Sequence, residues 1–372
     1  LQGLLLVIVL VSPPAIFPFK DMGMPDWTCD PSLMTRSKTK PTSVHALRPA
    51  DIDIVGALGD SLTAGNGAGA ENHDIFEVLV QYRGLTFSVG GDKDLSQHIS
   101  MANILKVFNP ELFGYSINTG SANVWENAHL NAGVPGANSY DLYTQAVEMV
   151  DRMKQHPEID FQNEWKLIHI FIGGNDMCGY CRNNEKESAD NFRDYIGQAV
   201  QYLKDNLPRT LVVLTGMLDL SLLRRVDPDK KFCLYLHESE CSCERNSSVS
   251  DQDLSTQSHA YMVTEQELQD SGEFDSSDDF SLVIAPFFEG VTDIARTPDG
   301  SVDFTFFAPD CFHFSAYGHA VVGKNLWNNL MQPVGSQTVG NLTDIGQPLL
   351  CPDKKCPFVR TTKNSANCAK YL

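Results

Sequence analysis

Short apolar runs along the chain have the length and composition of buried β-strands. Each is bounded by polar or turn-forming residues, and branched aliphatic side chains dominate, which is typical of strands covered on both faces of a parallel sheet. The runs are residues 52–58, 166–172, 211–215 and 282–287, with a weaker one at 115–117. We therefore expect these segments to form a central sheet.

Between the apolar runs lie segments whose apolar residues recur with helical spacing. Residues 139–153 place Leu142, Ala146 and Met149 on one side, and residues 191–207 follow the same pattern. A helix with one apolar stripe buries that stripe against a neighbouring layer. Strands that alternate with such helices predict a single α/β domain, a three-layer sandwich around a central parallel sheet.

The remaining segments divide the chain into three parts. Residues 1–24 form a leader, residues 25–332 the α/β domain and residues 333–372 a cysteine-containing tail. The domain ends in a predicted helix at residues 315–330. Within it, residues 233–280 are polar, serine-rich and acidic, which predicts an insertion at the surface.

The leader contains an apolar run at residues 3–12, followed by Pro13 and Pro14. A helix needs about 20 residues to cross a bilayer, so this run is too short to span one, but it matches the core of a secretory signal. No other stretch is long enough to cross a membrane. The sequence therefore predicts a secreted protein.

Composition and charge narrow the class of protein further. The 372 residues are 42% hydrophobic and 20% charged, as in ordinary globular proteins. The formal net charge is -19, and a field of that sign repels phosphate backbones. This charge argues against a nucleic-acid partner.

Ten cysteines agree with an oxidising compartment. Cys178 and Cys181 have the spacing of zinc ligands or of a redox pair, and Cys241 with Cys243 would complete a four-thiolate site. The signal-like leader favours disulfides instead. Their connectivity does not follow from the sequence.

Two N-x-Ser/Thr sequons begin at Asn246 and Asn341. Such asparagines are glycosylated only in chains that enter the secretory route. Both are expected to carry glycans if the leader directs secretion.

Three residues have the chemistry of a serine hydrolase. Ser61 follows the first apolar run in the string Gly-Asp-Ser-Leu, and far downstream the chain reads Asp310-Cys-Phe-His313. A serine hydroxyl needs an imidazole to accept its proton, and the imidazole needs a carboxylate to orient it. One turn can bring Asp310 and His313 together, because they are three residues apart. We expect Ser61 as nucleophile, His313 as base and Asp310 as its acid partner.

Two glycine-rich turns supply the donors that acyl transfer also requires. Negative charge develops on the former carbonyl oxygen, so hydrogen-bond donors aimed at that point lower the barrier. Residues 174–176 present the amide of Asn175 at a strand end, and residues 131–136 precede a helix. An oxyanion hole is therefore expected from Asn175 and from the backbone N–H groups of Gly136 and Ser61.

The four segments, in this order, resemble the GDSL, or SGNH, hydrolase superfamily, whose four blocks carry Ser, Gly, Asn and His. The matches are residues 59–62, 131–136, 174–176 and 310–313. The resemblance implies a flavodoxin-like fold and the same roles for Ser61, Gly136, Asn175 and His313. It leaves one role open, because Asp176 beside Asn175 is an alternative to Asp310 as the acid.

A closer resemblance is to the phospholipase B1 group of that superfamily. The strings at residues 57–70, 171–181 and 313–319 look like one catalytic unit of these enzymes, and the similarity covers residues 27–332. It implies a calcium-independent lipase, without metal or organic cofactor, that removes acyl chains from phospholipids and lysophospholipids at a lipid interface. Vertebrate members typically carry several units and a C-terminal membrane anchor, whereas this chain shows one unit and no apolar tail, so membrane association remains an alternative to secretion if the chain is part of a longer protein. We expect a monomer.

Three rival hypotheses remain at this level. The same four blocks serve many substrates, so an esterase for acetylated carbohydrates or other small esters is one alternative. A secreted lipid-binding relative that has lost turnover is the second. A zinc-dependent extracellular protein that uses the thiols and histidines is the third.

Overall fold

The computed structural model describes residues 20–71, 74–226, 231–340, 342 and 346–372. The signal-like run at residues 3–12 and the sequon asparagine Asn341 lie outside these ranges. At the centre of the molecule is a parallel sheet with the strand order β1-β2-β3-β4. The strands are β1 (Ile52–Gly59), β2 (Trp165–Phe171), β3 (Thr210–Thr215) and β4 (Phe280–Ala285).

Every strand residue is buried, which explains the nearly continuous aliphatic runs in the sequence. The four strong strand predictions are confirmed. The weaker one at residues 115–117 is wrong, because this segment forms only isolated bridges. Phe113 and Asn131 pair with β1 at Ile54 and Ala57 along its outer edge. A flavodoxin-like sheet has a further strand next to β1. Here irregular chain occupies that position.

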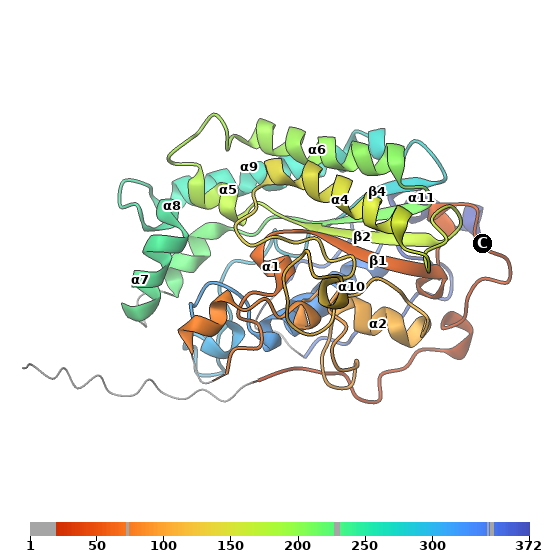
Figure 1. The fold of residues 1–372 in the computed structure, drawn as a ribbon, viewed down its shortest axis with the longest axis horizontal. Coiled ribbons are helices and arrows are strands. Elements are labelled where there is room, and N and C mark those ends of the chain that lie inside the picture. The colour runs from red at the N-terminus through yellow and green to blue at the C-terminus, as the bar shows by residue number, and fades with distance from the viewer. Residues whose placement is uncertain (1–19, 72–73, 227–230, 341, 343–345) are drawn as a thin grey trace, which may run out of the picture.

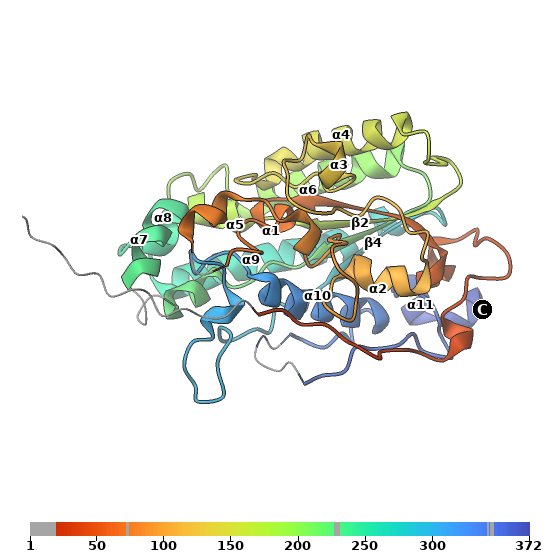
Figure 2. The same ribbon diagram turned by 60° about the horizontal axis from the view of Figure 1, so that its bottom comes forward.

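Helices cover both faces of the sheet, as Figures 1 and 2 show. On one face α4, α6 and α9 lie side by side, and on the other are α1, α2 and α10. The three-layer α/β architecture is thus confirmed. The helix bounds are α1 (Ser61–Ala64), α2 (Met101–Phe108), α3 (Trp125–Ala128), α4 (Leu142–Gln155), α5 (Gly174–Gly179), α6 (Ala189–Asn206), α7 (Lys231–Glu240), α8 (Ser242–Arg245), α9 (Asp251–Asp270), α10 (Ala316–Met331) and α11 (Thr362–Ala366).

Residues 233–280, expected to be a polar surface insertion, are largely helical and partly buried. They contain most of α7, all of α8 and all of α9. The long helix α9 connects β3 to β4 and packs against α6 and β4. It buries Leu254, Tyr261 and Leu268. This segment therefore contributes α9 to the layer that also contains α4 and α6.

The described part of the tail packs on the domain. The indole N–H groups of Trp27 and Trp327 donate to the carbonyls of Leu349 and Leu350 at 2.9 and 2.8 Å. The Cys29–Cys351 disulfide joins the tail to the start of the domain.

All ten cysteines are paired, including the four that match the spacing of a zinc site. The pairs are Cys29–Cys351, Cys178–Cys241, Cys181–Cys243, Cys233–Cys311 and Cys356–Cys368. These cysteines are thus joined in disulfides and do not form a four-thiolate zinc site. Among the described residues, no helix has the length and apolarity needed to cross a bilayer.

Removal of the Cys29–Cys351 disulfide tests how far the tail stabilises the domain. This bond closes a loop with a sequence separation of 322 residues, whereas Cys356–Cys368 spans only 12. Because a longer closed loop restricts the unfolded chain more, Cys29→Ala with Cys351→Ala should lower the free energy of unfolding by about 2–5 kcal/mol. Cys356→Ala with Cys368→Ala serves as the control and should cost less. Equal losses in denaturant unfolding would contradict the expectation.

Candidate active site

Ser61 stands at the first position of α1, directly after β1. The turn that places it there depends on Gly59, whose φ is +155°. A Cβ at Gly59 would approach Thr63 Oγ1 to 2.2 Å and Phe171 O to 2.3 Å, so no other residue fits this turn. Asp60 caps α1 by accepting a hydrogen bond from the Leu62 N–H at 2.9 Å.

Ser61, His313 and Asp310 form one hydrogen-bonded chain. His313 Nε2 lies 2.8 Å from Ser61 Oγ, and His313 Nδ1 lies 2.5 Å from Asp310 Oδ2. Asp310 Oδ1 also accepts the backbone N–H groups of Phe312 and His313, each at 3.0 Å. A carboxylate only accepts, so Nδ1 carries the proton and Nε2 is free to accept from the serine hydroxyl. All three residues are buried.

The segment that carries Asp310 and His313 is a closed hairpin. Phe307 pairs with Phe314, and the Ala308 N–H donates to the His313 carbonyl at 2.8 Å. At its tip Cys311 has a φ of +64° and is bonded to Cys233 of α7. The hairpin is therefore held both by its own pairing and by the disulfide to α7.

The charges of Asp310 and His313 stabilise each other. Burial alone would lower the pKa of His313, but the Asp310 carboxylate holds that pKa above its usual value. Burial alone would raise the pKa of Asp310, but the charge of His313 and the hydrogen bonds it receives keep that pKa below its usual value. The geometry thus favours an ionised Asp310 that stabilises a protonated His313.

Glu240, at the end of α7, lies in the electrostatic environment of this pair. Burial, followed by the negative charge of Asp310, raises the pKa of Glu240 to about 7. The ring of His237, one turn earlier on α7, contacts that of Phe312 with centroids 5.8 Å apart. The helix therefore brings a carboxyl group near the hairpin of Asp310 and His313, and no motif in the sequence indicates this proximity.

The loop at residues 131–137 lies along the end of β1. The N–H groups of Ala132 and Val134 donate to Ala57 O and Gly59 O at 2.8 and 3.0 Å. Gly136 has a φ of +79°, which favours glycine. Among the described residues, the N–H groups of Gly136 and Ser61 have no acceptor. Both are thus available as donors.

Asn175 lies at the first turn of α5, after β2. Its Nδ2 donates to Ala137 O at 2.8 Å, which uses one of its two amide hydrogens. This bond also places the side chain beside the Gly136 loop. Asn175 and Ser61 line the same cavity. The structure thereby brings together the residues expected to form an oxyanion hole.

Asp176 has a different environment from the one expected of a catalytic acid. It is fully buried and accepts hydrogen bonds from the Ser139 N–H, at 3.1 and 3.0 Å to its two oxygens, and from the Ser139 hydroxyl. Burial raises its pKa. Of the two candidate acids, Asp310 is the one that contacts His313. Asp176 instead connects α5 to the turn that follows the Gly136 loop.

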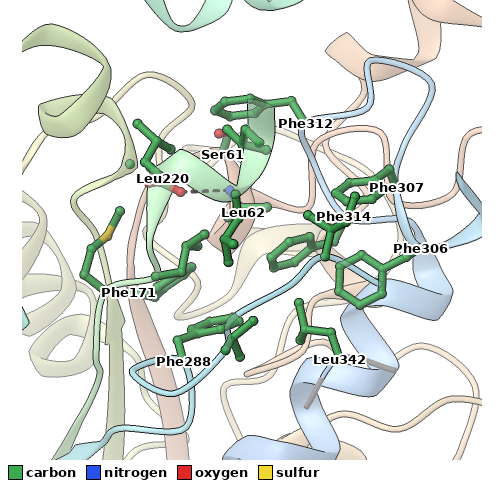
Figure 3. A pocket seen from close by; sticks show the side chains of 18 of the residues that line it. Ser61, Leu62, Phe171, Leu220, Phe288, Phe306, Phe307, Phe312, Phe314 and Leu342 are labelled. Carbon is green, nitrogen blue, oxygen red and sulfur yellow. Dashed lines mark hydrogen bonds between the residues drawn. The ribbon is translucent and has the colours of Figure 1, made fainter. Parts of the chain in front are cut away.

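An apolar cavity leads away from Ser61 (Figure 3). Its polar residues, Asp60, Ser61 and Asn175, come from the ends of β1 and β2. The rest of the lining is apolar except for Gly174: Leu62, Phe171, Met217, Leu218, Leu220, Leu222, Leu223, Phe288, Val291, Ile294, Phe306, Phe307, Phe312, Phe314 and Leu342. These residues come from segments far apart in the sequence, so no local motif predicts the cavity.

Of the predicted glycosylation sites, Asn246 is described and exposed at the end of α8. No group of three or more metal-ligating side chains occurs within the described residues.

The family is shown by a model of the GDSL-like lipases and acylhydrolases, which matches residues 55–326. That range covers most of the chain and includes the end of β1, the loop at residues 131–137, α5 and the hairpin that carries Asp310 and His313. The chain therefore belongs to the GDSL-like lipase/acylhydrolase family of ester hydrolases.

Within this family, the chain is similar to membrane-associated phospholipase B1. It is 43% identical to the human protein over 334 residues, which is 88% of this chain and 23% of that protein. For the mouse protein the identity is 43%, with 22% of that protein covered. The chain thus spans less than a quarter of the length of these relatives. A solved structure of a putative GDSL-like lipase from Parabacteroides merdae covers 77% of this chain and 98% of its own, with 13% identity and a TM-score of 0.41.

Titration of His313 tests the proposed charge pairing. The His313 imidazole should titrate above the usual value of 6.5 in nuclear magnetic resonance spectra, because the Asp310 carboxylate favours the protonated form. Asp310→Asn should move the midpoint to lower pH, since it removes that charge. Glu240→Gln should move it less, because Glu240 contributes less than Asp310. An unchanged midpoint in Asp310→Asn would show that the two side chains are not coupled.

Proposed function

We propose that the chain is a secreted serine esterase of the phospholipase B type, which hydrolyses acyl esters of phospholipids and lysophospholipids through an acyl-enzyme. The observation that carries this proposal is the chain of hydrogen bonds from Asp310 through His313 to Ser61, placed at one end of an apolar cavity. The similarity to phospholipase B1 supports the same substrate class.

In the acylation step, Ser61 Oγ attacks the carbonyl carbon of the ester as His313 Nε2 takes the hydroxyl proton. The ionised Asp310 stabilises the imidazolium that forms. His313 then donates the proton to the departing alcohol oxygen, and the acyl group stays on Ser61. The lysophospholipid or glycerophospho-alcohol leaves.

Three donors stabilise the negative charge that develops on the former carbonyl oxygen. They are the N–H groups of Ser61 and Gly136 and the second amide hydrogen of Asn175. Because these donors are fixed by the turn after β1, the loop at 131–137 and α5, they need little reorganisation during the reaction.

In the deacylation step, His313 takes a proton from a water molecule, which attacks the acyl carbon and releases the fatty acid. The proton returns to Ser61 Oγ. This sequence of proton transfers requires no metal or organic cofactor.

The cavity favours a long acyl chain over an acetyl group. Its lining beyond Ser61 consists almost entirely of aliphatic and aromatic side chains. Burial of apolar area contributes about 0.8 kcal/mol per methylene group, and an acetyl group offers little such area. A carbohydrate acetylesterase would also need polar groups for the sugar, whereas the polar lining residues are Asp60, Ser61 and Asn175.

An extracellular location accords with the disulfides and with the exposed sequon at Asn246. The cytosol keeps such thiols reduced, so five disulfides favour an oxidising compartment.

The first prediction for this function concerns Ser61. A fluorophosphonate probe should label the native protein and leave Ser61→Ala unlabelled, because the probe reacts only with an activated serine. The native protein should release fatty acid from phosphatidylcholine and lysophosphatidylcholine, and acetate from acetylated sugars slowly or not at all. Equal labelling of both proteins would disprove the mechanism, and preferential acetate release would favour the carbohydrate esterase. Lipid binding by the native protein without labelling or acid release would favour the non-catalytic relative.

A second prediction concerns the oxyanion hole. Asn175→Ala should lower kcat about 10²–10³-fold with a smaller change in KM, because the lost hydrogen bond forms fully only in the transition state. Asn163→Ala, in the turn that precedes β2, is a matched control and should retain native kinetics. If KM rose and kcat stayed unchanged, Asn175 would be a binding residue instead of an oxyanion donor.

A further inference from the structure

Three large apolar side chains are exposed on two short helices near the catalytic hairpin. Phe76 and Leu79, on the 3-10 helix Ile75–Leu79, are 78% and 76% exposed, and Tyr235 on α7 is 68% exposed. They are the most exposed large apolar side chains of the described residues apart from the terminal Leu372. We refer to Phe76, Leu79 and Tyr235 as the rim residues.

The helix Ile75–Leu79 is packed against the segment that follows Ser61, and that segment in turn approaches the hairpin of His313. A Cβ at Gly67, six residues after Ser61, would lie 3.0 Å from Ala308 Cβ and 3.2 Å from Val78 Cα. Ala308 in turn bonds the carbonyl of His313. Val78 is the buried residue of this helix. Phe76 and Leu79, three residues apart, therefore extend outward from a helix that is anchored beside the active site.

Tyr235 is linked to the hairpin of His313 through α7. It lies on α7 two residues after Cys233, which is bonded to Cys311 between Asp310 and His313. In Figures 1 and 2, α7 and the orange helix near residue 76 lie at the same end of the molecule. The rim residues thus come from α7, which is bonded to the hairpin of His313, and from a helix that is packed against the segment after Ser61.

The surroundings of Phe76 and Leu79 are acidic. Glu71, Asp74 and Glu77 lie on the same segment, and all three carboxylates act on Tyr82, whose pKa is raised to about 12 by burial and by their charges. The net charge of the whole chain is also negative, at -19. A surface with exposed apolar groups among carboxylates attracts cationic groups and is repelled by anionic lipid.

We infer that the rim residues are a docking surface for a lipid layer with choline headgroups, into which Phe76, Leu79 and Tyr235 insert while nearby carboxylates face the ammonium groups. The surface would bring the cavity to the lipid from which an acyl chain enters. This inference rests on the proposed function, because it assigns the rim residues to delivery of that substrate. Its basis is the attachment of the two helices to the segments of His313 and Ser61, together with the negative charge around Phe76 and Leu79.

Vesicle binding tests the docking surface without turnover. In the Ser61→Ala background, Phe76→Ser with Leu79→Ser should weaken binding to phosphatidylcholine vesicles at least about tenfold, since the two apolar side chains would no longer be buried in the lipid. Tyr235→Ser should weaken it less. Val107→Ser is a control, because Val107 is an exposed apolar residue on α2 beside Asn109, which bonds Ile52 at the opposite end of β1. It should bind like the parent.

Vesicles that differ in headgroup charge test the docking surface independently. Equimolar phosphatidylserine in the vesicles should weaken binding, and added salt should restore part of it, because the repulsion is screened. The double variant Glu71→Gln/Glu77→Gln should bind vesicles with and without phosphatidylserine with more similar affinities. Tighter binding to vesicles that contain phosphatidylserine would overturn the inference.

Hydrolysis of a soluble short-chain ester separates this inference from the proposed function. The Phe76→Ser/Leu79→Ser variant with native Ser61 should hydrolyse that ester at the native rate and phosphatidylcholine vesicles at least about tenfold more slowly. Loss of both activities would show that the helix is needed for the site itself and would overturn the docking role. If the native protein hydrolysed neither substrate, the proposed function would fail, and vesicle binding alone would decide the docking surface. The native protein could also form a dimer that the rim substitutions dissociate. That result would identify the rim residues as a contact between two copies of the chain and would overturn the docking role.

Discussion

The hydrogen bond between Ser61 Oγ and His313 Nε2 connects residues 252 positions apart, and the fold around the site maintains it. A bond of this length tolerates little displacement, so both segments must be fixed independently. Ser61 is fixed by the glycine turn at the end of β1 and by the Asp60 cap. His313 is fixed by its own hairpin and by the Cys233–Cys311 disulfide. The parallel sheet contributes by placing the strand ends that carry Ser61 and Asn175 at one edge.

Much of the fold follows from the sequence, because burial on both faces leaves a clear pattern. The four strands and the helices α4, α6 and α10 were all predicted within a few residues. Only the part of α9 around residues 264–268 shows a helix-like pattern in the sequence, and the rest is obscured for a physical reason. Its inner face includes Ser258, Glu265 and Gln269, which bond the backbone of Leu220, Met217 and Ile284. Polar residues that satisfy buried backbone groups look like surface residues in a sequence.

The sequence singles out the candidate catalytic residues because their order and local spacing are constrained. Asp310 and His313 lie in one turn, and Ser61 and Asn175 follow strands, so short strings identify them. The sequence did not show that Asp176 bonds Ser139, that Cys233 fastens α7 to the hairpin or that Glu240 lies near Asp310. These contacts depend on how segments far apart in the chain pack in three dimensions. For the same reason, sequence patterns do not predict the apolar cavity or the rim residues.

Burial separates the pKa values of the carboxyl groups around Ser61 and His313. Asp60 lines the cavity beside Ser61, and Glu240 lies near Asp310, so both carboxyl groups would oppose a developing negative charge if they were ionised. Burial raises the pKa of Asp60 to about 6 and that of Glu240 to about 7, which increases their neutral fractions near neutral pH. Asp310 has a lowered pKa because His313 and two backbone N–H groups stabilise its charge. The site therefore keeps ionised the one carboxylate that His313 requires, while the others are more easily protonated.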